Sequence, residues 1–118
     1  MAGTLTITSY EQPGGLVVTL RGPLDSATTH QLDRVIDLLM SSPPAGGLVV
    51  FDCSEVPLMG SLAMGAFIRL RRAYTKTGQT IRLSTLDPTV HGALKHARLH
   101  QFFEIYDTVE GALGQIVG

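Results

Sequence analysis

Several features that often reveal a protein's function are scarce in this sequence of 118 residues. It contains no tryptophan and a single cysteine, Cys53, which excludes an internal disulfide and favours a reducing compartment. Nine Lys and Arg oppose ten Asp and Glu, so no basic excess exists to attract nucleic acid or an anionic membrane. No apolar run approaches a membrane span and no signal peptide is visible, so we expect a cytoplasmic protein without membrane insertion.

The remaining composition is that of a folded protein. Hydrophobic residues make up 44% and charged residues 16%, which is typical of one globular domain over residues 1–118. No internal repeat, low-complexity segment or linker divides the chain. Arg69, Arg71 and Arg72 form the densest group of cations, and we interpret them as the exposed surface of a helix.

The hydrophobic pattern predicts the element order β-β-α-β-α-β-α-β-α. The predicted strands cover residues 5–9, 16–20, 48–51, 80–84 and 102–106. The predicted helices run from an Asp25 or Ser26 cap to the loop at 42–47, from 61 to about 74, from the Asp87 cap to about 97, and from Asp107 or Thr108 through Ile116. The first two strands form a hairpin, and the later alternation predicts an α/β fold with a mixed, mostly parallel sheet.

The segment between residues 51 and 65 is the most informative part of the chain. A continuous apolar strand pattern leads through an apolar loop to Gly60-Ser61, which opens a helix. The Ser61 hydroxyl is thereby placed at a helix N-terminus, where free N–H groups and the helix dipole favour negative charge. Two roles are open for it, a helix cap or a phosphorylatable switch.

Catalytic and cofactor motifs are missing. Met59 and Ala63 stand where a G-x-S-x-G nucleophile elbow around Ser61 would have glycines. The glycine spacing that follows resembles a Walker A loop, but Ala66-Phe67 replaces its Lys-Ser/Thr pair. No dinucleotide-binding glycine motif follows a strand, so we predict no enzymatic activity and no cofactor. A hydrolase that uses Ser61 is the weakest hypothesis.

The histidines and the cysteine also favour structural roles. His96 and His100 have i, i+4 spacing, but the helix is predicted to end near residue 97 and no cysteine or glutamate accompanies them. We interpret them as surface or partly buried residues and predict no metal. Cys53 follows a buried strand with no cation nearby, which favours a small buried side chain over a reactive thiolate.

Short motifs follow one another along most of the chain. They are Gly22-x-Leu24-Asp25, residues 48–54 with Val56, Gly60-Ser61-Leu62-Ala63-Met64-Gly65, Gly78-x-x-Ile81-x-Leu83, Pro88-x-Val90, Arg98-Leu99, Phe103-x-Ile105-Tyr106 and Glu110-Gly111-Ala112-Leu113. In this order and spacing they resemble the STAS domain of anti-sigma factor antagonists, from about residue 5 to residue 116. No single motif is specific, but their succession is.

The resemblance implies a non-enzymatic regulator in which Ser61 matches the phosphoacceptor serine. In that family, an anti-sigma factor with a kinase fold binds the unphosphorylated protein and releases sigma factor, and phosphorylation reverses this. Asp25 matches the family aspartate beside the phosphoacceptor, and a helix cap is its other possible role. Gly60, Leu62 and Ala63 replace the usual aspartate, second serine or threonine, and glycine.

Apolar residues run through the loop and around the first turn of the next helix. If these residues are exposed, they form a patch suited to a protein partner. If they are buried, they belong to the core. We expect some of them to be exposed, because they surround the first turn of the helix. The predicted partner-binding residues are Asp25, Leu58, Met59, Gly60, Ser61, Leu62 and Met64. An alternative function keeps the fold without the switch, as a constitutive interaction module such as a subunit on a transporter ATPase. The sequence leaves the oligomeric state open.

Overall fold

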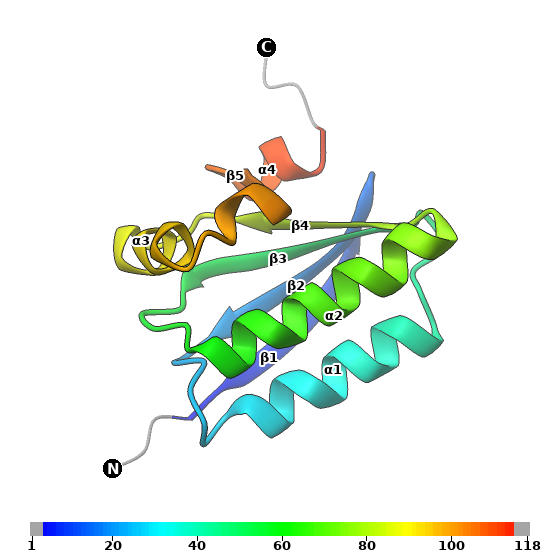
Figure 1. The fold of residues 1–118 in the computed structure, drawn as a ribbon. Coiled ribbons are helices and arrows are strands. Elements are labelled where there is room, and N and C mark those ends of the chain that lie inside the picture. The colour runs from blue at the N-terminus through cyan, green and yellow to red at the C-terminus, as the bar shows by residue number, and fades with distance from the viewer. Residues whose placement is uncertain (1–3, 115–118) are drawn as a thin grey trace.

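The computed structural model describes residues 4–114, which form one five-stranded sheet with helices on its two faces (Figure 1). The strands are β1 (Thr6–Gln12), β2 (Gly15–Arg21), β3 (Leu48–Glu55), β4 (Thr80–Ser84) and β5 (Glu104–Tyr106). The helices are α1 (Thr29–Ser41), α2 (Ser61–Thr77), α3 (Pro88–His96) and α4 (Val109–Ala112), and a short 3-10 helix, η1 (His100–Phe102), precedes β5.

The strands lie side by side in chain order, β1-β2-β3-β4-β5. β1 and β2 pair antiparallel, and β3, β4 and β5 extend the sheet in parallel. The predicted mixed α/β fold and element order are therefore confirmed. None of the helices within residues 4–114 is long and apolar enough to cross a membrane.

The main core lies between the sheet and helices α1, α2 and α3. Its centre is aromatic: the Phe67 ring of α2 lies 4.9 Å from Phe51 of β3 and 6.5 Å from Phe103, both edge to face. α1 and α2 lie next to each other over the sheet (Figure 1), and the buried Tyr74 hydroxyl donates to the Leu39 carbonyl at 2.7 Å. This hydrogen bond joins the ends of the two helices inside the core.

A smaller core lies on the opposite face of the sheet. Val17 and Val50 point to this side, because side chains alternate along a strand, and they pack against Ala112 and Leu113. β3 is consequently apolar on both faces over residues 48–51, as expected for a parallel strand covered on both sides. α4 is only about one turn long, so it covers a small part of this face.

Two element boundaries differ from the sequence prediction for local reasons. α1 begins at Thr29, because residues 25–28 form a turn in which the Asp25 carbonyl accepts the N–H groups of Thr28 and Thr29 at 3.2 and 3.0 Å. α2 continues to Thr77 and ends at Gly78 in the left-handed conformation, with φ 79°. The predicted end near residue 74 was therefore about one turn too early.

The last predicted strand and helix are shorter than expected. Phe102 was predicted in a strand but lies in η1, and β5 begins only at Glu104. The predicted Thr108 cap of α4 is confirmed, since its hydroxyl accepts the Gly111 N–H at 2.9 Å. Ile116, which was predicted in this helix, lies outside the described residues.

Candidate functional site

Ser61 is the first residue of α2, and it is exposed. Gly60 occupies the N-cap position, and no side chain caps this end of the helix. Among the described residues, no hydrogen bond engages the Ser61 hydroxyl. The interpretation of Ser61 as a helix cap is therefore wrong, and its hydroxyl is available to another molecule.

The start of α2 favours a negative charge on this serine. The first N–H groups of the helix have no partner within it, and no acidic residue lies in its first turn. A phosphate on Ser61 would lie at the positive end of a 17-residue helix, where an anion gains about 0.3–1 kcal/mol. The local electrostatics therefore suit a phosphorylated serine.

The apolar residues around Ser61 divide into two groups. Leu58 and Leu62 are 48% and 61% exposed, whereas Met59 and Met64 are 3% and 7% exposed and belong to the main core. Met59 is turned inward by a bridge to the connection between β2 and α1, and Met64 lies on the core side of α2. The expected exposure thus applies to the two leucines and not to the two methionines.

The loop before Ser61 is held by backbone hydrogen bonds to the β2–α1 connection. The Leu24 N–H donates to the Leu58 carbonyl at 2.8 Å, and the Gly60 N–H donates to the Leu24 carbonyl at 2.8 Å. Because Asp25 follows Leu24, these bonds hold its backbone beside the segment that carries Ser61. The structure therefore brings together two segments of the predicted site that are far apart in sequence.

Asp25 itself has a structural task. Its carboxylate accepts the N–H groups of Ala27 and Thr28 at 2.9 and 3.1 Å, which stabilises the turn before α1. The prediction that Asp25 caps the helix is therefore wrong, because Thr28 occupies the N-cap position of α1 and Asp25 stabilises the turn before it. A role of Asp25 toward a modified Ser61 stays a prediction.

Cys53 is fully buried, as predicted. Burial, with a smaller contribution from the charge of Asp52, raises the pKa of its thiol from 9.0 to about 12. Below about pH 9 the thiol is protonated in the folded and unfolded chains alike. Above that, the unfolded chain ionises before the folded one, so this group lowers stability as the pH rises toward 12.

We expect native protein at pH 8 to resist alkylation of Cys53 by iodoacetamide, because the thiol is both buried and protonated. Mass spectrometry should show one modification after unfolding in guanidinium chloride and none before. A Ser26→Cys variant is the control, since residue 26 is exposed and its new thiol should react in the native protein. Rapid native labelling of Cys53 itself would contradict the burial.

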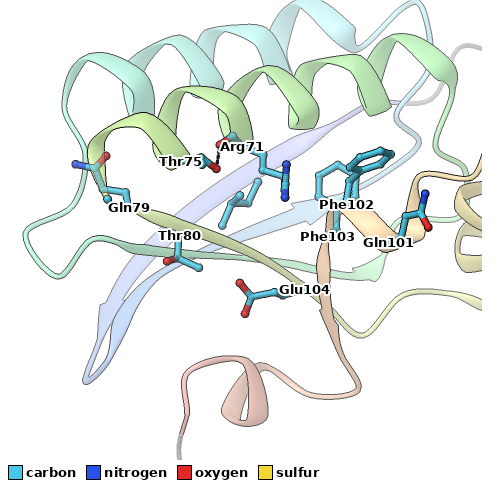
Figure 2. Close-up of a pocket in the computed structure, with 10 residues that line it drawn as sticks. Arg71, Thr75, Gln79, Thr80, Gln101, Phe102, Phe103 and Glu104 are labelled. Atoms are coloured by element: carbon cyan, nitrogen blue, oxygen red, sulfur yellow. Dashed lines mark hydrogen bonds between the residues drawn. The ribbon is translucent and has the colours of Figure 1, made fainter.

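The sheet edge holds a cavity that the sequence prediction missed. A space of about 410 Å³ lies between the C-terminal half of α2 and the η1–β5 segment (Figure 2). Arg71 and Thr75 line its α2 side, while Thr80 and Glu104 line the sheet side. The Arg71 guanidinium lies 5.8 Å from the Phe102 ring centroid. The only sequence signal for this site was the arginine cluster, which does not reveal the opposite wall.

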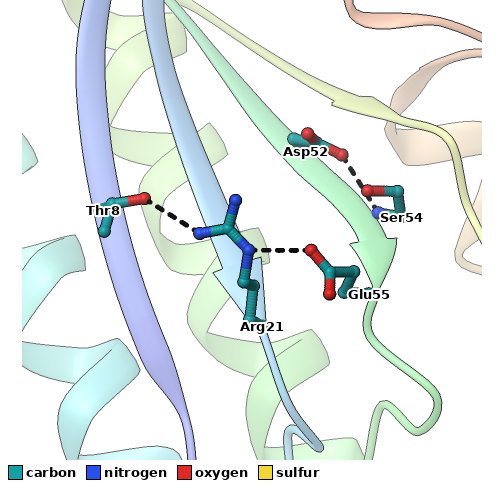
Figure 3. A network of polar contacts seen from close by, with 5 residues as sticks. All are labelled: Thr8, Arg21, Asp52, Ser54 and Glu55. Atoms are coloured by element: carbon teal, nitrogen blue, oxygen red, sulfur yellow. Dashed lines mark hydrogen bonds and ion pairs between the residues drawn. The ribbon is translucent and has the colours of Figure 1, made fainter.

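The polar side chains at the ends of β2 and β3 are structural. Arg21 pairs with Glu55 at 2.7 Å and reaches the Thr8 hydroxyl at 3.5 Å, while the Asp52 carboxylate accepts the Ser54 N–H at 3.0 Å (Figure 3). The ion pair is largely exposed and contributes at most about 1 kcal/mol. No group of three His, Cys, Asp or Glu residues within 4–114 is arranged to hold a metal ion.

Several solved structures have the same fold. An anti-sigma factor antagonist from Mycobacterium paratuberculosis matches with a TM-score of 0.83 and 22% identity, over 94% of this chain and 92% of its own. Unphosphorylated SpoIIAA, also an anti-sigma factor antagonist, matches with a TM-score of 0.75 and 18% sequence identity, over 93% of each chain. Phosphorylated SpoIIAA from Bacillus matches with a TM-score of 0.68 and 17% sequence identity, over 94% of this chain and 97% of its own. A sulfate transporter family protein from Wolinella succinogenes matches with a TM-score of 0.70 and 16% sequence identity, over 83% of this chain and 80% of its own.

These similarities define the class of fold, a small α/β domain found both in anti-sigma factor antagonists and in a transporter family protein. No curated protein sequence matches the chain. The family model of the STAS domain matches residues 6–112. The chain belongs to the STAS domain family.

Proposed function

We propose that this protein is an anti-sigma factor antagonist that acts by binding and not by catalysis. Its partner is an anti-sigma factor with a kinase fold, and phosphorylation of Ser61 ends the complex. The observation that carries the proposal is the position of Ser61, exposed at the first residue of α2 with its hydroxyl unbonded among the described residues.

The surroundings of Ser61 support a protein interface. Exposed leucines at 58 and 62 supply apolar area on either side of the hydroxyl, and the bonded β2–α1 connection makes the loop a fixed surface. The proposed contact surface is Asp25, Leu58, Gly60, Ser61 and Leu62. Met59 and Met64 support it from the core. A phosphate in such an apolar contact would carry nearly two negative charges and oppose binding.

The Ser61 switch can be tested with the partner recovered from native cells by affinity purification. We expect incubation with that kinase and ATP to add one phosphoryl group by intact mass, and none to a Ser61→Ala variant. We expect Ser61→Asp to weaken partner binding by about 10- to 100-fold in calorimetry, because its charge enters an apolar contact.

A matched control separates charge at the interface from charge in general. Ser42→Asp adds the same charge at an exposed serine that precedes β3, whereas Ser61 follows the other end of that strand. Binding should be unchanged in this variant. No added phosphate on the wild type, together with unchanged binding of Ser61→Asp, would reject the switch.

The constitutive interaction module is the second candidate. The transporter family match and the exposed Leu62 in place of a hydroxyl residue favour it. Affinity purification distinguishes the two, since recovery of a transporter ATPase would support this candidate and recovery of a kinase-like anti-sigma factor would support the first.

A further inference from the structure

The outer surface of α2 carries charge of one sign. The helix holds four of the nine Lys and Arg residues and no Asp or Glu. Arg69 is paired with Asp33 and Asp37 of α1 at 3.3 and 3.5 Å. Within residues 4–114, Arg71, Arg72 and Lys76 have no ion-pair partner. Three cations of α2 therefore have no compensating carboxylate among the described residues, and Arg72 and Lys76 are exposed while Arg71 is half-buried, on a protein whose net charge is −1.

The same surface is hollowed on both sides of Arg72. One hollow of about 470 Å³ extends to Met40 of α1, and a second of about 160 Å³ extends to Leu99 and Phe102. Ile68 and Arg72 line both hollows. Arg71 and Phe102 also line the cavity of Figure 2, so the depressions adjoin one another.

We call this band the α2 groove and define it by Met40, Gly65, Ile68, Arg72, Leu99 and Phe102. Its floor is apolar, and its rim is formed by the unpaired cations. Phe102 is 43% exposed, which is unusual for a large aromatic side chain. The groove thus combines an uncovered apolar floor with uncompensated positive charge.

Gly65 contributes to the shape of the groove. It lies inside α2, is exposed, and a Cβ at this position would meet no atom within 4 Å. Glycine is the least favourable residue except proline in a helix interior, so neither the helix nor the packing inside this chain requires it here. Its effect is to leave a flat place on the helix surface, which lets another backbone approach closely.

We propose that the α2 groove is a second docking surface and that its occupant is an acidic amphipathic helix of a protein partner. Apolar residues at helical spacing would cover Ile68 and Phe102, while Asp or Glu on the flanks would pair with Arg71, Arg72 and Lys76. The three cations around an apolar floor complement a helix that has apolar residues on one face and acidic residues beside them. A nucleic acid or anionic lipid surface would instead need a wider and more uniformly basic patch.

A designed peptide tests this chemistry directly. The probe is an amphipathic helix of about 18 residues, or about five turns, with Leu on one face and Glu on both flanks. Titrated into nitrogen-15-labelled protein, it should shift the amide resonances of Gly65, Ile68, Ala73 and Phe102. The same peptide with Lys in place of Glu should leave them unchanged, since it presents the wrong charge.

Two matched pairs of variants locate the contact. Arg72→Glu should weaken binding about tenfold, and Arg34→Glu, an equal charge change outside the groove, should leave it within about twofold. Gly65→Gln should weaken it about tenfold by filling the groove. Gly92→Gln is its control, because Gly92 also lies inside a helix with open space at Cβ. Both glycine variants should melt no lower than the wild type, so misfolding would not explain a loss.

The proposal is independent of the Ser61 switch, so Ser61→Ala should bind the peptide normally. Absence of amide shifts, or shifts confined to other surfaces, would overturn it. Larger shifts of the same amides with a single-stranded RNA or with phosphatidylglycerol vesicles would also overturn it, by showing that the groove selects a polyanion.

Discussion

Replacement of Phe67 by alanine is expected to lower the free energy of unfolding by about 3–5 kcal/mol. The Phe67 side chain is fully buried and touches Phe51 and Phe103 edge to face, so its loss opens a cavity where β3, α2 and the segment before β5 meet. A domain of this size has a total stability of roughly 5–15 kcal/mol, so the variant would lose a large part of it. Urea unfolding followed by circular dichroism measures the change.

Leu62→Ala is the control for this experiment. Leu62 lies on the same helix but is 61% exposed, so its truncation should change stability by no more than about 0.5 kcal/mol. Equal losses in the two variants would contradict the described core. Because Leu62 belongs to the proposed contact surface, this variant should also bind the partner less tightly while remaining folded.

Gly22→Ala is expected to cost at least about 3 kcal/mol, although it adds a single methyl group. Gly22 has φ 127°, a conformation that L side chains rarely adopt, and its N–H donates to the Glu55 carbonyl at 2.9 Å. A Cβ here would collide with the Thr4 carbonyl oxygen and lie 3.2 Å from the Leu5 Cα. The backbone just before β1 or the β2–α1 connection must therefore move, and thermal unfolding would report the loss.

Two other glycines separate the causes of this effect. Gly78→Ala should cost only about 1 kcal/mol, because φ is 79° but no atom lies within 4 Å of the new Cβ. Gly46→Ala should be nearly neutral, since it has neither constraint. A Gly22→Ala variant as stable as Gly46→Ala would show that the described contact between Gly22 and Thr4 is absent.

The fold could be predicted because its signals are local in the chain. The Asp87 carboxylate caps α3 by accepting the Thr89 N–H at 2.8 Å, with Pro88 at the first helical position as expected. The apolar run over residues 48–51 became the doubly covered strand that such runs predict. These features require only neighbouring residues, and pattern reasoning finds them.

The candidate site was only partly predictable, because its geometry depends on distant segments. Whether an apolar residue of the loop faces solvent is decided by the bridge between Leu24 and Met59 and by the side of α2 that meets the sheet. Hydrophobic patterns alone do not predict which side of the loop and of α2 faces the core, so the prediction places Met59 and Met64 with the exposed leucines. The position of Ser61 depended on one helix start and was predicted correctly.

The α2 groove could not be predicted for the same reason. Its walls come from α1, α2 and η1, and only their packing places Met40 and Phe102 on the two sides of Arg72. In the sequence, the arginine cluster had the appearance of an ordinary helix surface. Its pairing pattern distinguishes it, because Arg69 is compensated and Arg72 is not.

The strand order of the sheet also has a consequence for biosynthesis. Each strand after β1 pairs with the strand that precedes it in the chain, so one pairing partner has already emerged from the ribosome when a new strand emerges. The sheet can grow outward from the β1–β2 hairpin one strand at a time, because each new strand adds to the free edge left by the strand before it. α4 is the last described element and completes only the smaller core, so the aromatic centre of the domain does not depend on it.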